Sequence, residues 1–141
     1  MNTIETNIAV ARQFLAAMAK LDIDGMTSLV APDFILDSKG SSSMSGPRTL
    51  AELPQIIQMM RHFLPKGATL EILNMTADES RVACEAKGDA MTVDGKPYRN
   101  QYHFLIELKN AKITKCSEYM DTRLMDEIFS PLIAQMTAAK T

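Results

Sequence analysis

The stretch that decides the fold is residues 81–122, RVACEAKGDAMTVDGKPYRNQYHFLIELKNAKITKCSEYMDT. Its residues alternate in polarity over long runs, which is typical of strands with one buried face. Two breaks separate the runs, at Asp94-Gly95 and Asn110-Ala111. Asp-Gly is a strong hairpin signal, and Asn tolerates the positive φ that tight turns require. We therefore predict consecutive antiparallel strands over 81–91, 96–108 and 112–122, preceded by another strand over 68–75.

Helical periods appear on both sides of this region. The remaining predicted elements are a helix over 3–20 capped by Thr3, a short helix over 22–30, a strand over 34–36, a loop over 40–47, a helix over 54–64, and a final helix over 123–140 kinked by Pro131. Helices followed by a run of antiparallel strands favour an α+β fold. We expect residues 1–141 to form a single domain, a cone-shaped, curved antiparallel or mixed sheet wrapped around N-terminal helices. Such a sheet encloses an apolar cavity suited to a small ligand.

The composition fits one globular domain and argues against several classes of partner. The chain has 141 residues, of which 46% are hydrophobic and 23% charged, and its formal net charge is −2. This charge provides no field that attracts phosphate groups, so we expect no nucleic-acid partner. No apolar run approaches the roughly 20 residues that span a bilayer. The first residues lack the basic and apolar regions of a leader, so we expect a cytoplasmic protein without membrane contact.

The cysteines and histidines do not form a metal-binding pattern. Cys84 and Cys116 are the two cysteines, and His62 and His103 are the two histidines. Reduced, buried thiols are the default for cysteines inside the cell. Because neither Cys-x-x-Cys nor His-Glu-x-x-His occurs, we predict no metal site. The acid–base chemistry considered below needs no organic cofactor, so we predict none.

Methionine is unusually frequent, with eleven residues against no tryptophan and 6% aromatic residues. Its flexible, polarizable side chain fills irregular space, so it can line a ligand cavity or simply replace leucine in the core. Met18 and Met60 lie on the apolar stripes of predicted helices, and Met120 lies beside Glu118 on the last strand. We predict that these three methionines line the cavity.

The two predicted turns fix the pairing of the strands. Counting from Asn110-Ala111 places His103 opposite Glu118, and counting from Asp94-Gly95 places Ala86 opposite His103. The other neighbours on that face are small, apolar or sulfur-containing, and such surroundings raise the pKa of a carboxyl group. The His103–Glu118 pair is therefore either a proton-transfer site or a structural pair that ties two strands together.

One β-bulge would exchange the two faces and send Asn100 and Tyr102 to the cavity instead. In the register without a bulge, Phe104, Ile106 and Leu108 lie on the outer face of the sheet. A strand that is apolar on both faces is covered on both, and the helices can cover only one. We therefore predict a homodimer through the outer sheet face.

Three groups of residues are similar to a known family. They are Asp22-Ile23-Asp24-Gly25-Met26 before Ala31-Pro32-Asp33-Phe34, then Asn100-x-Tyr102-His103-Phe104, and finally Ala111-Lys112-Ile113 leading to Glu118-Tyr119-Met120-Asp121-Thr122. In order and spacing they resemble the SnoaL-like branch of the NTF2-like superfamily over nearly the whole chain. This resemblance implies a ketosteroid-isomerase-like cone of α+β class, usually dimeric, with a deep pocket. It does not settle the chemistry, because members of the superfamily perform unrelated reactions or only bind.

Position by position, the resemblance disfavours two of those reactions. Ketosteroid isomerases have a tyrosine in the first helix where this chain has Phe14, and their base falls near Ser38. Limonene-epoxide hydrolases use an Asp-Arg-Asp set, two members of which fall near Ala86 and Gly88. The single acid of SnoaL-type polyketide cyclases matches Glu118, so the resemblance retains that class.

Our first hypothesis is a cofactor-independent isomerase, cyclase or lyase that performs acid–base chemistry on a small apolar carbonyl compound. Glu118 would be the acid/base, with His103 or Tyr102 as its hydrogen-bonding partner. The predicted substrate-binding residues are Asn100 as an orienting donor, with Met120, Met60, Met18, Phe14 and Phe34. The alternatives are a non-catalytic binding module for a hydrophobic metabolite and a dimeric interaction subunit.

Overall fold

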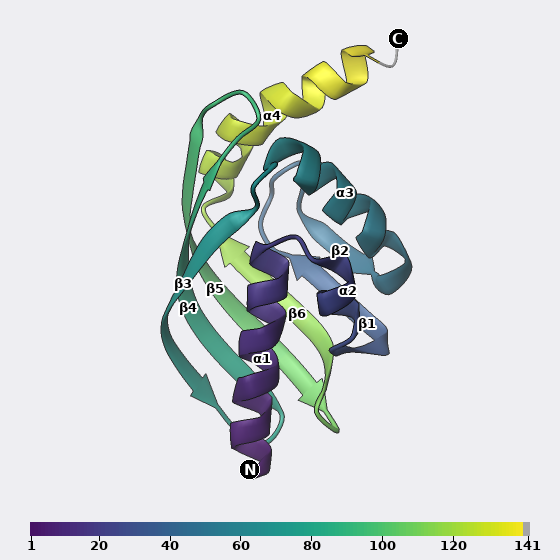
Figure 1. Cartoon of the computed structure of the whole chain (residues 1–141), viewed down its shortest axis with the longest axis vertical. Helices are drawn as coiled ribbons and strands as arrows, with labels where there is room; N and C mark the ends of the chain where they lie inside the picture. Colours follow the sequence, from purple (N-terminus) through teal and green to yellow (C-terminus); the bar gives the residue numbers. More distant parts are fainter. Residues whose placement is uncertain (140–141) are drawn as a thin grey trace.

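The computed structural model describes residues 1–139, which contain a six-stranded curved sheet packed against helices (Figure 1). The strands are β1 (Val30–Ser38), β2 (Gly46–Thr49), β3 (Ala68–Ala77), β4 (Arg81–Met91), β5 (Pro97–Lys109) and β6 (Lys112–Met120). Their order in the sheet is β2-β1-β6-β5-β4-β3. β1 and β6 run parallel, and the other neighbouring strands are antiparallel. The sheet is open, with β2 and β3 as its edges.

The helices cover the concave side of this sheet. They are α1 (Thr3–Ala19), α2 (Ile23–Thr27), α3 (Leu53–Phe63) after the 3-10 turn η1 (Leu50–Glu52), and α4 (Thr122–Ala139). α1 crosses the sheet, whereas α4 continues from β6 at the far end of the molecule (Figure 1). Ala11, Phe14 and Leu15 on α1 are fully buried. The predicted α+β class, with a curved mixed sheet wrapped around N-terminal helices, is confirmed.

Several element boundaries differ from the sequence prediction. Asn2, not Thr3, caps α1 with its side chain. The short second helix ends at Thr27 because β1 begins three residues later. The predicted loop over 40–47 leads into β2, which contains Pro47. Proline is tolerated there because an edge strand can leave one hydrogen-bonding position unused.

The hairpin between β5 and β6 contains a bulge. Both turn residues, Asn110 and Ala111, have positive φ angles, which matches the predicted two-residue turn. Thr114, however, is an extra residue on β6, so Glu118 pairs with Phe104. The prediction that His103 lies opposite Glu118 is therefore wrong.

The hairpin between β4 and β5 is shifted as well. Met91 pairs with Pro97, which leaves a longer loop than the predicted two-residue turn at Asp94-Gly95. His103 consequently lies opposite Glu85 rather than Ala86.

These shifts place the apolar residues of β5 on the concave face. Phe104, Ile106 and Leu108 are buried in the core, so the prediction that they face outward is wrong. The homodimer was inferred from that placement and stays a prediction.

Two further findings concern the core and the helices. Cys84 and Cys116 are free and buried, as predicted, and burial raises the pKa of both thiols.

Within residues 1–139, every helix is too short or too polar to cross a membrane.

Candidate functional site

A cavity of about 410 Å³ lies between the concave face of the sheet and the helices. Its volume falls in the range typical of small-molecule sites. Seven of the eleven methionines line it, namely Met18, Met26, Met44, Met59, Met60, Met120 and Met125. Met18, Met60 and Met120 are the three that the sequence analysis selected. The wall is therefore mainly apolar and built from flexible side chains.

Glu118 brings a carboxyl group into this apolar wall. On β6 it is paired with Phe104 of β5 and with Ser38 of β1. The side chain is half-buried because it faces the cavity, and within residues 1–139 no hydrogen bond or ion pair holds the carboxyl. Loss of water raises the pKa of Glu118 to about 7. Near neutral pH, Glu118 can therefore either accept or donate a proton.

Two tyrosine hydroxyl groups lie in the same cavity. Tyr102 donates to the Tyr98 oxygen at 3.4 Å, and Asn100 Nδ2 donates to that oxygen at 2.8 Å. Burial is the main cause that raises the pKa of both tyrosines, and the nearby Glu118 charge adds to it. The hydroxyls therefore keep their protons at neutral pH. Such donors can stabilise negative charge on a carbonyl oxygen.

Asn100 supports this arrangement from behind the cavity. It is only 4% exposed and is not among the lining residues. Its Nδ2 also donates to the Asp121 carbonyl at 3.1 Å, and its Oδ1 accepts the backbone N–H groups of Gln101 and Asp121 at 2.8 and 3.2 Å. Because the protein itself occupies these donors and acceptors, Asn100 positions Tyr98 and joins β5 to α4.

A glycine makes room for the second tyrosine. A Cβ atom at Gly88 would lie 2.9 Å from Cε2 of Tyr102, closer than real Cβ contacts allow. Glycine at this position on β4 therefore lets the Tyr102 ring lie against the strand.

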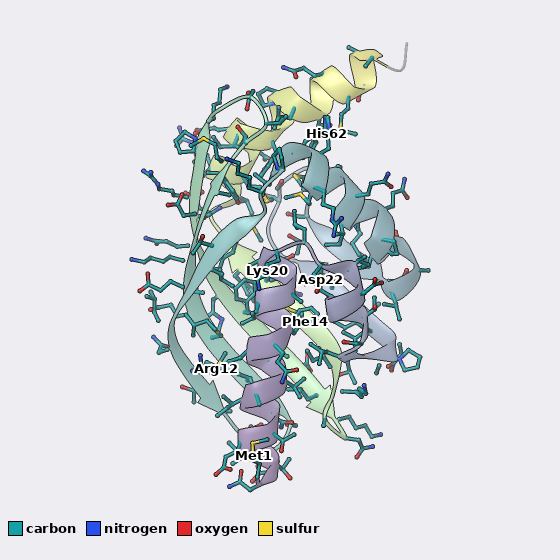
Figure 2. All side chains as sticks on the ribbon, viewed as in Figure 1. Met1, Arg12, Phe14, Lys20, Asp22 and His62 are labelled. Atoms are coloured by element: carbon teal, nitrogen blue, oxygen red, sulfur yellow. The ribbon has the colours of Figure 1, made fainter. Side chains whose placement is uncertain are left out.

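Besides Asn100, three of the predicted site residues lie away from the cavity. His103 is exposed on the convex face, with its ring 6.4 Å from that of Tyr119. Phe14, which projects from α1 (Figure 2), and Phe34 are buried with their rings 5.7 Å apart. The structure thus does not bring His103 to Glu118, and the two phenylalanines support the wall from inside the core.

Sequence reasoning missed Tyr98 and Arg48 as cavity residues. For Tyr98 a signal was present, since the spacing Tyr98-x-Asn100-x-Tyr102 places three polar side chains on one face of a strand. Arg48 follows the predicted loop over 40–47 and was assigned to no element, so the direction of its side chain could not be inferred. Within residues 1–139, no group of three or more His, Cys, Asp or Glu side chains could hold a metal ion.

A curved, open mixed sheet packed against helices is the α+β fold of the NTF2-like proteins. The SnoaL-like domain matches this sequence over residues 11–116, and the chain belongs to that family. Its members include polyketide cyclases and hydroxylases. The sequence has no significant match among curated proteins.

Solved structures show the same fold. PrhC from Penicillium brasilianum NBRC 6234 is 21% identical, with a TM-score of 0.84 over 97% of this chain and 94% of that chain. AusH from Aspergillus nidulans is 19% identical, with a TM-score of 0.74 over 84% and 85% of the two chains. TerC, co-crystallized with polyporic acid, is 18% identical, with a TM-score of 0.76 over 89% and 98%. These identities support a shared fold and no more.

Proposed function

We propose that this protein is a cofactor-independent enzyme of isomerase, cyclase or lyase type that transfers a proton on a small apolar carbonyl compound. The observation that carries the proposal is the Glu118 carboxyl, which has no protein partner in residues 1–139 and faces an apolar cavity shared with two tyrosine hydroxyls. A titratable group with a pKa of about 7 in a cleft is typical of a general acid or base.

The proposed reaction begins when the Glu118 carboxylate removes a proton from the carbon next to the carbonyl group. The electron pair of that C–H bond forms a carbon–carbon double bond. The π electrons of the carbonyl group move onto its oxygen, which gives an enolate. Tyr102 donates to Tyr98, so the Tyr98 proton is available for this oxygen. The protonated Glu118 then returns the proton to the same or another carbon. Alternatively, the enolate carbon attacks a second carbonyl group and closes a ring, and the alkoxide that forms takes the proton from Glu118. Proton transfer of this kind requires neither a metal nor an organic cofactor.

Deuterium incorporation tests the proposal without knowledge of the natural substrate. The enzyme is incubated in D2O with bicyclic ketones such as 1-indanone and 2-tetralone, and exchange next to the carbonyl group is followed by NMR. We expect Glu118→Gln to lower the catalysed exchange about 10²- to 10⁴-fold, the range typical of a general base. Tyr98→Phe should lower it less. The matched control is Glu85→Gln on the convex face, which should leave exchange unchanged.

The pH dependence of exchange is part of the same test. Because the base form of Glu118 performs the first step, the rate should rise with pH and level off above about pH 7. If the ketones bind but show no Glu118-dependent exchange at any pH, the proposed enzymatic function is wrong.

A second candidate function is a non-catalytic binding module for a hydrophobic metabolite. The seven methionines around the cavity support it, because flexible thioether side chains adapt to differently shaped ligands. Ligand binding that survives Glu118→Gln, with no exchange, would favour this function.

The predicted homodimer and cytoplasmic location also remain part of our proposal. Tyr119, 47% exposed beside His103 on the convex face, offers an aromatic contact to a second subunit. A monomer at micromolar concentration in analytical ultracentrifugation would contradict the dimer and, with it, the interaction-subunit alternative.

A further inference from the structure

Arg48 is a cationic side chain in the wall of a mainly apolar cavity. On β2 it pairs with Leu36, so it lies on the concave face of the sheet, and it is half-buried. Its Nη1 donates to the carbonyl oxygen of Pro47 at 3.1 Å, and its Nη2 to that of Met44 at 3.3 Å. A Cβ atom at residue 46 would lie 3.0 Å from Nη1, so Gly46 leaves room for the guanidinium. The backbone thus holds the cation in place.

The charge of Arg48 has no ion-pair partner. Within residues 1–139, no carboxylate oxygen lies within 4.0 Å of its nitrogens. The nearby Glu52 carboxylate is bound by the backbone N–H and hydroxyl of Thr49, which lower its pKa more than the Arg48 charge does. A guanidinium has five N–H donors, and the two carbonyl groups use only part of this capacity. The remaining donors are available to a ligand.

The other charged groups of the cavity do not neutralise Arg48 either. Asp89 is exposed and forms an ion pair with Arg99 at 3.4 Å. Glu118 titrates near neutral pH and forms no ion pair with Arg48. An anion that enters the cavity therefore meets a guanidinium that forms no ion pair within residues 1–139.

The strand register fixes the relation between Arg48 and Glu118. Gly46 on β2 pairs with Ser38 on β1, and Ser38 pairs with Glu118 on β6. Arg48 lies two residues further along β2, so its Cα is about 12 Å from that of Glu118 at ordinary strand spacing and rise. Two side chains that start this far apart and enter the same cavity can contact different ends of one bound molecule.

We propose that Arg48 forms an anion-binding subsite of this cavity, and that the substrates carry an acidic group, a carboxylate or an ionised enol, on the same apolar body as the reacting carbonyl. This inference rests on the proposed function and narrows its substrate class. Arg48 binds the acidic group and orients the molecule, so that the carbon to be deprotonated lies at Glu118.

Two fluorescent probes with the same skeleton isolate the contribution of charge. 8-Anilinonaphthalene-1-sulfonate is N-phenyl-1-naphthylamine with one added sulfonate, and both emit more strongly in apolar surroundings. Charge-assisted hydrogen bonds stabilise by about 1.5–3 kcal/mol, so we expect the sulfonate to bind about tenfold more tightly or better. Arg48→Met should remove that preference and leave N-phenyl-1-naphthylamine binding unchanged. Arg48→Lys should retain part of it, and Arg99→Met, the exposed control, all of it.

The outcomes separate this inference from the proposed function. Equal affinity of the two probes for the natural protein, or the same loss of both on Arg48→Met, would overturn the subsite. Failure of both probes to bind would overturn it as well. Ketone exchange that depends on Glu118 but not on Arg48 would still support the enzyme in any of these cases. Circular dichroism and the melting temperature of Arg48→Met show whether a lost preference reflects a lost fold.

Discussion

The two faces of β5 differ sharply although their residues alternate along one strand. On the concave face, Tyr98 and Asn100 are buried and hydrogen-bonded to each other. On the convex face, the intervening Arg99, Gln101 and His103 are exposed. The surroundings of a side chain on β5 therefore depend on the face that it occupies, and the candidate site lies on the concave face.

The two carboxyl groups that flank β5 illustrate the difference. Glu85 on the convex face is exposed and accepts a hydrogen bond from Asn74 at 3.3 Å. Glu118 on the concave face loses water without gaining a partner within residues 1–139, which raises its pKa to about 7. Glu118 is a candidate base because of its surroundings, since Glu85 is the same residue type and lacks them.

The largest expected contrast concerns packing. Phe104→Ala should lower the free energy of unfolding by about 3–5 kcal/mol, because the ring is 1% exposed and stacks on Tyr102. Leu105→Ala, one residue away on the convex face, should cost about 1 kcal/mol or less because that side chain is only half-buried. Urea unfolding at constant m-value measures both. Similar losses would show that the convex face is covered by another surface, as in the predicted dimer.

The sequence predicted most elements because periodicity reports which residues are buried. All four main helices and the strands of residues 68–120 follow from it, and β2 was missed because four residues that include a proline carry no period. The β6 bulge had a signal that was not used. Ile113 and Cys116 are three positions apart and would point to opposite faces of a regular strand, so an extra residue between them is needed to place both in the core.

The candidate site was predictable only in part. Glu118 and the three methionines that the sequence analysis selected line the cavity, and the signal for each was the apolar character of its neighbours on the strand or helix. His103 was selected through its register, and the bulge at Thr114 moved it to the other face. Local sequence patterns thus indicate which residues are buried. Which residue pairs with a buried group depends on the strand register, and one extra residue in a strand changes that register.

The second contrast compares the two carboxyl groups through pH. Folded Glu118 keeps its proton up to about pH 7, whereas the unfolded chain loses it near the ordinary value of 4.5. The unfolded state therefore binds fewer protons between these values, and stability falls as pH rises through that window. A pKa shift of this size corresponds to about 3 kcal/mol of unfolding free energy. This contribution is lost in full above pH 7.

Glu118→Gln should remove this loss. The variant should match the natural protein near pH 4 and exceed its unfolding free energy by about 3 kcal/mol at pH 8. Chemical unfolding across this pH range measures the difference, and Glu85→Gln serves as the convex control with no change in slope. A flat profile for the natural protein would mean that Glu118 is solvated or paired, and that it is unsuitable as the proposed base.

The smallest contrast concerns adjacent side chains on β5. Asn100→Ala removes the donor to Tyr98 and leaves the Asp121 N–H and carbonyl without their partner, which should cost about 2 kcal/mol. Gln101→Ala, whose side chain is exposed, should change stability by less than about 0.5 kcal/mol.

Stability alone does not separate a structural role from a positioning role, so ketone exchange is measured in the same variants. If Asn100 positions the Tyr98 hydroxyl, Asn100→Ala lowers the exchange rate at saturating ketone. The same substitution then has no further effect on exchange in the Tyr98→Phe variant. Additive effects of the two substitutions would show instead that Asn100 only joins β5 to α4.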